Sequence, residues 1–133
     1  MSVAIRIVQL GSKRAPNEGV RIGTVRRPPR GVPRNEYAKR DFYDVWLPEL
    51  APSAALLGWY KALPEGPQNW ERFMLRYQKE MSQAPAVRIL ELLALLSRSV
   101  DFSVGCYCQD EGRCHRSTLR TILKEHGASI VHP

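Results

Sequence analysis

The chain has 133 residues, 44% of them hydrophobic and 25% charged, with a net charge of +7. The length suits one domain with its own apolar core, and the composition excludes wholesale disorder. No apolar run approaches the roughly 20 residues that span a bilayer, and the first residues lack the features of a secretory signal. We therefore expect one domain over residues 1–133 that does not enter a membrane.

The positive charge is concentrated in the first third of the chain. Residues 1–40 carry ten Lys or Arg and only two acidic residues, whereas residues 41–133 carry ten basic and eleven acidic ones. Prolines at 28, 29 and 33 interrupt the basic segment and predict an extended loop at about 26–34, because proline cannot continue a helix. Such a loop attracts phosphate groups, although a basic surface without a dedicated ligand has the same pattern.

The first half of the chain contains strand and loop signals. Residues 4–10 alternate apolar and polar side chains, which predicts a strand. Residues 20–25 predict a second short strand, and the basic loop follows it. Pro52 suits the first turn of a helix that carries Leu56 and Trp59, because its missing N–H needs no partner there.

The second half predicts three helices and a strand. Asn69, a favourable N-cap residue, is expected to begin a helix whose apolar residues recur at helical spacing. Residues 86–98 predict a mostly buried helix, and residues 100–108 are typical of a strand. A last helix is expected over residues 116–126, with Gly127 as its terminator. Strands at both ends with helices between them predict a small layered α/β fold, with a mostly parallel sheet flanked by helices.

The segment 106–117 carries the main chemical signal. It contains, in order, Cys106, Cys108, Arg113, Cys114, His115 and Arg116. It lies where the predicted strand ends and the last helix begins, which is the edge at which open α/β sheets bind ligands. Backbone N–H groups, the helix dipole and the arginines all favour an anion there. Three crowded cysteines are a poor disulfide framework, so we expect reduced thiols and a cytoplasmic setting.

A metal site is the first interpretation of this segment. Its candidate ligands, suited to iron or zinc, are Cys106, Cys108, Cys114 and His115. Strand alternation would place Cys106 and Cys108 on the same side. The spacing C-x-C-x5-C-H differs from the paired C-x2-C of a zinc ribbon, and we do not expect the adjacent Cys114 and His115 to reach one ion easily.

Cysteine chemistry is the second interpretation, with Cys108, Cys114 and His115 as catalytic candidates. The C-x5-R spacing of phosphatase loops is missing, since Arg113 is one position too far from Cys106 and one too near Cys108. Cys108 and Arg113 have the C-x4-R spacing of loops that resemble rhodanese, which favours a sulfurtransferase-like or redox enzyme. In the third interpretation the segment binds an anion, and the cysteines are small buried apolar residues.

Several stretches of the chain resemble a known family. Residues 22–32 (IGTVRRPPRGV) and 43–53 (YDVWLPELAPS) are similar to the YeaO-like branch of the domain-of-unknown-function family 488. Residues 73–80 fit its F-x3-Y-x2-E pattern, and residues 114–116 (CHR) resemble a motif of the same broad family. The resemblance covers most of the chain and implies a small cytosolic α/β fold without a settled reaction.

Together these features predict one anion-binding site at the carboxyl edge of the sheet. Asp44 and Trp46 are included because they accompany large aromatic side chains just after the basic loop. The ligand-binding candidates are Arg26, Arg27, Arg30, Asp44, Trp46, Arg113 and Arg116. A nucleotide or a nucleic acid is the expected ligand, since both offer phosphate. A non-catalytic module that binds nucleic acid through the basic loop is the alternative to an enzyme.

Overall fold

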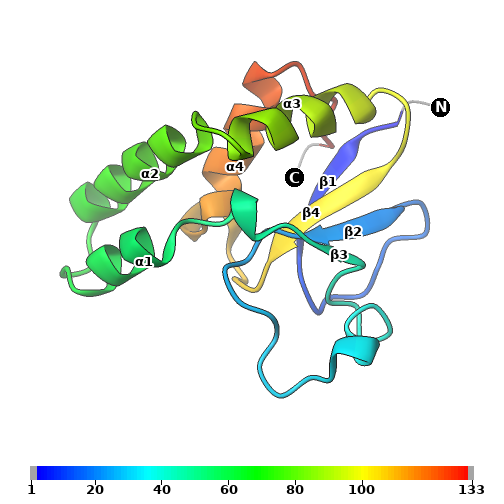
Figure 1. The fold of residues 1–133 in the computed structure, drawn as a ribbon, viewed down its shortest axis with the longest axis horizontal. Helices are drawn as coiled ribbons and strands as arrows, with labels where there is room; N and C mark the ends of the chain where they lie inside the picture. Colours follow the sequence, from blue (N-terminus) through cyan, green and yellow to red (C-terminus); the bar gives the residue numbers. More distant parts are fainter. Residues whose placement is uncertain (1–2, 132–133) are drawn as a thin grey trace.

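The computed structural model describes residues 3–131, which form a four-stranded sheet and four α-helices (Figure 1). All strands are parallel, in the order β1-β4-β2-β3. The strands are β1 (Ile5–Gln9), β2 (Val20–Gly23), β3 (Val45–Trp46) and β4 (Phe102–Cys106). The helices are α1 (Ala54–Lys61), α2 (Pro67–Met81), α3 (Ala86–Leu96) and α4 (His115–Glu125). The predicted α/β class with a parallel sheet is confirmed.

The helices gather on one side of the sheet and form the main core with it (Figure 1). Ile5, Ile22, Phe102 and Val104 line this face of the sheet, and none is more than 7% exposed. They pack against buried residues of the helices, among them Leu56, Phe73, Tyr77, Leu90, Leu119 and Leu123. Burial of each large apolar side chain contributes about 1.5–3 kcal/mol. Because side chains alternate along a strand, the same face continues at Cys106, which is also buried.

A buried ion pair occupies the opposite face of the sheet. The Arg21 guanidinium donates from Nε and Nη2 to the two carboxylate oxygens of Glu18, at 2.6 and 2.9 Å. Its Nη1 donates to the carbonyls of Ser12 and Asp41, and the Ser103 hydroxyl donates to Glu18 at 2.7 Å. Arg21 is therefore a structural residue that ties two loops to the sheet, although its sequence position lies in the basic third of the chain.

Several element boundaries differ from the sequence prediction. Helix α2 begins at Pro67, and Asn69 lies inside its first turn, where the side-chain amide donates to the Pro64 carbonyl. Helix α1 is capped by Ser53, whose hydroxyl accepts the Leu56 N–H at 3.0 Å, so Pro52 precedes the cap. In both cases the residue at which the helix begins depends on the geometry of the preceding turn, which local residue preferences do not determine.

Two further differences concern the candidate site and the sheet edge. Strand β4 ends at Cys106, so Cys108 lies in the following loop and strand alternation does not place it. Helix α4 begins at His115, and Gly127 ends it with a φ of +86° as predicted. The two-residue edge strand β3 was not predicted, because it pairs only through Val45 and Trp46. Within residues 3–131, no helix combines the length and the apolar character that crossing a membrane requires.

Candidate functional site

The cysteine-rich segment lies at the carboxyl edge of the sheet, between β4 and α4 (Figure 1). Cys106 is the last residue of β4, and Cys114 immediately precedes the first residue of α4. The loop between them includes a short 3-10 helix, Glu111–Arg113. The chain following β2 passes beside the same edge, since Thr24 N–H donates to the Gly105 carbonyl at 2.9 Å. Two neighbouring parallel strands therefore both deliver residues to this edge.

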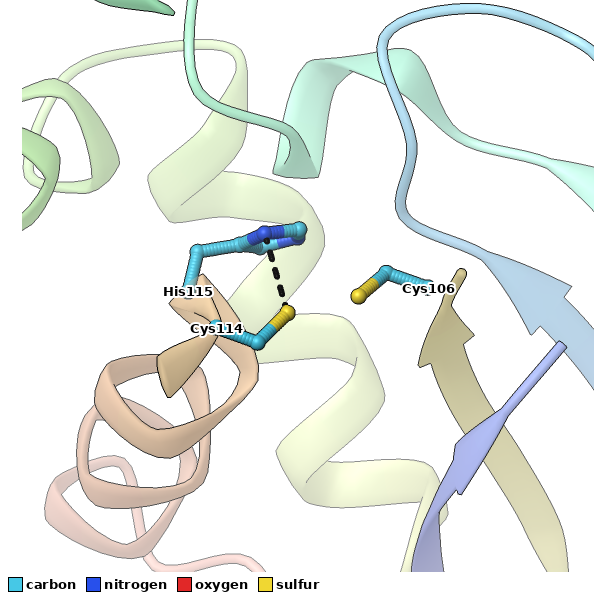
Figure 2. Close-up of side chains that lie close together, drawn as sticks. All are labelled: Cys106, Cys114 and His115. Atoms are coloured by element: carbon cyan, nitrogen blue, oxygen red, sulfur yellow. Dashed lines mark hydrogen bonds between the residues drawn. The ribbon is translucent and has the colours of Figure 1, made fainter. Parts of the chain in front are cut away.

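Three side chains converge on one point of this edge (Figure 2). The sulfurs of Cys106 and Cys114 and a ring nitrogen of His115 all lie within 4.8 Å of one another. The Cys114 sulfur is 3.6 Å from His115 Nδ1. Cys106 and Cys114 are 3% and 2% exposed, so the cluster lies beneath the surface. We refer to Cys106, Cys114 and His115 as the Cys/His cluster. Adjacent Cys114 and His115 do point at a common position, in contrast to the sequence expectation.

The protonation state of His115 follows from its hydrogen bonds. Its Nε2 lies 2.9 Å from the Thr24 carbonyl oxygen, which can only accept, so Nε2 carries the proton. Nδ1 therefore presents its lone pair to the Cys114 sulfur. Burial lowers the pKa of His115 from 6.5 to about 4, against the opposing effect of the Thr24 carbonyl, so the ring is neutral at pH 7. The Tyr77 ring packs edge-on against the imidazole at 5.3 Å and holds its plane.

Cys108 lies beside the Cys/His cluster but faces solvent. The pKa of Cys108 is lowered because its sulfur accepts hydrogen bonds from Cys106 and Cys114, and because the positive charge of Arg116 favours its thiolate. The pKa of Cys106 is raised by its hydrogen bonds to the other two sulfurs and then by burial. Of the three thiols, the exposed Cys108 is therefore the one whose surroundings favour the thiolate.

Arg116, in the first turn of α4, supplies the positive charge of this edge. It is 3% exposed, and its Nη2 donates to the Cys108 carbonyl at 2.6 Å, while Nε has no hydrogen-bond partner among the described residues. Burial lowers its pKa, but negative charge on the three cysteines raises it more, and it is always protonated. No carboxylate of residues 3–131 forms an ion pair with Arg116. The three cysteines are therefore the groups whose deprotonation would provide a countercharge for Arg116.

Further contacts fix the loop between Cys106 and Cys114. Arg120 binds both carboxylate oxygens of Glu111, at 2.6 and 2.9 Å. The Asp110 carboxylate accepts the Gly112 N–H at 2.9 Å. The Tyr107 hydroxyl donates to the Arg27 carbonyl, which attaches the loop to the basic segment. With both of its ends held by buried residues, the loop presents Cys108 at a defined place.

The remaining predicted ligand-binding residues do not point into the Cys/His cluster. The Arg26 guanidinium donates to the carbonyls of Ala51 and Pro52 and so anchors the chain before α1. Asp44 accepts from Arg14 at 2.8 Å and from the Arg21 N–H at 2.8 Å. Trp46 donates from Nε1 to the Val25 carbonyl at 2.7 Å. Each of these side chains therefore has a partner of its own.

The other arginines of the prediction are at the surface. Arg27 and Arg30 are exposed on the basic loop, with no ion pair among the described residues. Arg113 is exposed and lines a separate pocket of about 700 Å³ with Tyr60 and Trp70. Only Arg116 of the predicted arginines directly contacts the cysteine-bearing segment through its side chain.

Two residues of the site were missed by the sequence prediction. Thr24 holds the His115 imidazole with its carbonyl, and a main-chain atom leaves no signal in residue type. Tyr77 contacts the ring from the middle of α2, where helical spacing assigns it to the core. The F-x3-Y-x2-E pattern was the available signal for Tyr77, since a tyrosine that belongs to a family pattern can have a role besides packing in the core.

Comparison with known proteins places the chain in a family. A family model described as "Active DUF488-N3 subclade" matches residues 5–127. The chain belongs to the DUF488 family. It is 28% identical over 119 residues to the uncharacterized protein Rv3073c of Mycobacterium tuberculosis and to the uncharacterized protein Mb3100c of Mycobacterium bovis, covering 90% of this chain and 92% of each relative. No solved structure is significantly similar. The resemblance noted in the sequence is confirmed at the level of the family.

Proposed function

We propose that this DUF488 protein holds a single zinc or iron(II) ion at the Cys/His cluster and uses it for catalysis. Cys106, Cys114 and Nδ1 of His115 would be its three protein ligands. A set of three protein ligands is typical of catalytic zinc, where the fourth position receives water or substrate. The observation that carries the proposal is the convergence of the three ligand atoms within 4.8 Å.

The spacing of the ligand atoms suits a tetrahedral ion. With metal–sulfur and metal–nitrogen distances of about 2.3 and 2.0–2.1 Å, tetrahedral geometry separates sulfur and nitrogen ligands by about 3.5–3.6 Å. Cys114 Sγ and His115 Nδ1 are 3.6 Å apart. An ion would therefore need little movement of these two ligands, and a modest rotation would bring in Cys106.

The surroundings of the ligands support the same proposal. Ligating histidines usually donate their second ring N–H to a carbonyl or carboxylate, and here His115 Nε2 donates to Thr24. Arg116 provides one buried positive charge. A divalent ion bound by three thiolates, with Cys108 added, has one excess negative charge that this guanidinium balances. Cys108 is accessible from solvent and would act as a ligand that an incoming group displaces.

A metal at such a position supplies a Lewis acid or activates a bound water. The chain's own residues would set the conditions for this chemistry. Buried Cys106 and Cys114 exclude bulk water from one side of the centre, and the neutral His115 offers a lone pair without first losing a proton. An anionic substrate would approach from the Cys108 side, where Arg116 and the start of α4 favour negative charge.

A metal-free cysteine enzyme is the second candidate, favoured by the exposed position of Cys108 beside a buried guanidinium without a carboxylate partner. In this case Cys108 would be a nucleophile in sulfur transfer or in thiol redox chemistry. The two candidates predict different thiol counts. A metal-free protein has three titratable thiols, whereas a bound ion protects at least Cys106 and Cys114.

The deciding experiment is metal analysis of untagged protein purified anaerobically without chelator, by mass spectrometry, with free thiols counted alongside. We expect near-stoichiometric zinc or iron in the wild type, and loss of most of it in Cys106→Ser, Cys114→Ser and His115→Ala. His126→Ala is the matched control, because His126 is exposed beyond the end of α4. A wild-type protein that neither contains nor takes up zinc or iron, with three reactive thiols, would refute the metal centre in favour of cysteine chemistry.

A further inference from the structure

A second pocket of about 480 Å³ lies on the basic segment, between the 3-10 helix Arg34–Glu36 and the edge strand β3. Its lining includes Arg34, Asn35, Tyr37, Tyr43, Asp44 and Trp46. We call it the aromatic pocket. Its volume is within the range of pockets that enclose a small ligand. It is separate from the Cys/His cluster, and none of the metal ligands lines it.

The aromatic side chains of the pocket are held in place. Trp46 is 38% exposed, and its Nε1 donates to the Val25 carbonyl at 2.7 Å, which fixes the indole plane. The rings of Tyr37 and Tyr43 meet edge to face at 5.2 Å. Because the indole is already held in place, little conformational entropy is lost when a flat ring stacks on it. Proteins that bind nucleobases without sequence preference use such stacking.

One polar group of the pocket lacks a partner. Tyr43 is 4% exposed, and its hydroxyl has no hydrogen-bond partner among the described residues. A buried hydroxyl left unpaired costs free energy, so native structures seldom keep one without a reason. The exposed amide of Asn35 offers both a donor and an acceptor at the same pocket. The Asn35 amide suits the polar edge of a heterocyclic base, and a small movement of Tyr43 would let its hydroxyl pair with the same base.

Positive charge surrounds the mouth of the pocket. Arg34 lines it, and Arg27 and Arg30 are exposed on the preceding loop, with no ion pair for any of the three within residues 3–131. Asp44 is the one acidic lining residue, and Arg14 neutralises it at 2.8 Å. A base in the pocket would therefore have its phosphate group beside unpaired guanidinium groups, which bind phosphate well.

We propose that the aromatic pocket binds one nucleotide unit, with the base against Trp46 and the phosphate at Arg34. The unit belongs to a single-stranded nucleic acid or to a free nucleotide, which share this chemistry. Tyr43 also packs in the small apolar cluster that contains Cys106 and Cys114. The bound nucleotide would thus contact a residue of the apolar cluster that also contains two of the proposed metal ligands. None of the proposed metal ligands lines the pocket, so nucleotide binding there does not depend on a metal.

The test measures binding of fluorescein-labelled single-stranded DNA and RNA homopolymers by anisotropy, and of free nucleoside monophosphates by calorimetry. We expect Trp46→Ala to weaken binding roughly tenfold or more, and Trp46→Phe, which keeps a ring, to retain most of it. Arg34→Ala should weaken binding and reduce the slope of log K against log salt by about one for the oligonucleotide. Arg88→Ala is the matched control, because it removes one exposed arginine from α3.

The two sources of the nucleotide separate in this experiment. Tight binding of oligonucleotides with weak binding of monophosphates identifies a nucleic acid, and equal binding identifies a free nucleotide. Binding by neither, or binding that Arg88→Ala weakens as much as Arg34→Ala does, overturns the proposal. Arg34 is exposed, so its variant tests the pocket even if Trp46→Ala does not fold. Metal content measured on each variant shows whether the Cys/His cluster is unaffected.

Discussion

Two buried arginines of this protein have opposite surroundings. Arg21 in β2 is fully buried, and Glu18, two carbonyls and an adjacent serine complete a closed network around the ion pair. Arg116 in α4 is 3% exposed, yet it has one carbonyl partner and an Nε without any. A buried guanidinium in which each nitrogen has a hydrogen-bond acceptor stabilises the fold. One that borders sulfur atoms and retains an unpaired donor is available for chemistry.

The largest effect is expected when the closed network is broken. Glu18→Gln leaves the Arg21 guanidinium buried without a countercharge. Arginine does not lose its proton in proteins, so the free energy of burying this unpaired charge cannot be reduced by neutralisation. Loss of one partner of a buried ion pair destabilises a protein by about 3–5 kcal/mol. Urea unfolding in the presence of a chelator measures this free energy without a contribution from metal.

Glu71→Gln is the control for that substitution, because Glu71 is exposed on α2 and surface changes usually stay within about 0.5 kcal/mol. If Glu18→Gln were as stable as Glu71→Gln, the pair would not be the structural anchor that its geometry indicates.

The same pair makes stability depend on pH. Burial raises the pKa of Glu18, but hydrogen bonds from Arg21, Ser103 and the Ala15 N–H outweigh it and lower the pKa from 4.5 to about 2. The folded protein therefore binds fewer protons than the unfolded chain below pH 4.5, and stability decreases as the pH falls from 4.5 towards 2. The loss should reach about 3 kcal/mol.

Unfolding measured across this pH window in wild type and in Glu18→Gln isolates the contribution of Glu18. The difference between the two proteins should shrink as the pH falls, since the wild type loses the stabilisation that the variant never has. A difference that stays constant down to pH 2 would contradict the lowered pKa of Glu18.

The contrast between the two arginines shows where sequence interpretation succeeds and where it stops. The α/β class, the strand that ends at Cys106 and the helix that follows Cys114 come from patterns of apolar residues that tertiary contacts reinforce. Arg116 lies in the segment that the sequence marks as a candidate anion site, and Arg21 lies in the basic first third of the chain. Their roles differ because of tertiary contacts that no local pattern contains, such as the Asp41 carbonyl on Arg21 and the Ser103 hydroxyl on Glu18, 85 residues away.

For the candidate site, the residue types could be predicted from the sequence, but their orientation could not. Cys106, Cys114 and His115 could be nominated because sulfur and imidazole are recognisable ligands at a strand-to-helix junction. The orientation of His115 could not be predicted, since it depends on the Thr24 carbonyl 91 residues earlier in the chain. Asp44 and Trp46 of the aromatic pocket were among the predicted ligand-binding residues, but the sequence prediction assigned them to the same site as the cysteines and not to a pocket of their own.

Arg116→Met is expected to have a smaller effect, and the effect is on metal affinity rather than on stability. Without the guanidinium the excess negative charge of the thiolates is uncompensated, and groups around a metal site typically change its affinity by 10–100-fold. Zinc competition against a chromophoric chelator measures the change, with Arg88→Met as the control on α3. Its cost in folding free energy without metal should be lower than that of Glu18→Gln, because a sulfur that loses its partner can take up a proton.

The smallest effect should come from Thr24→Val, which separates the side chain of Thr24 from its carbonyl. The Thr24 hydroxyl lies 3.3 Å from His115 Nε2, whereas the carbonyl lies 2.9 Å from it and also fixes the proton on that nitrogen. Valine keeps the carbonyl, so zinc affinity should change by no more than about twofold. Stability should fall by about 1 kcal/mol, because the hydroxyl also donates to the Gly105 carbonyl.

A tenfold loss of zinc affinity in Thr24→Val would show that the hydroxyl, and not the main chain, orients His115. His115 would then be held by a residue type that a sequence does display. Unchanged zinc affinity together with reduced stability would show that the backbone that follows β2, and not the Thr24 side chain, orients the His115 ring. The Cys/His cluster would then depend, as Arg21 does, on main-chain oxygens of segments that border the sheet.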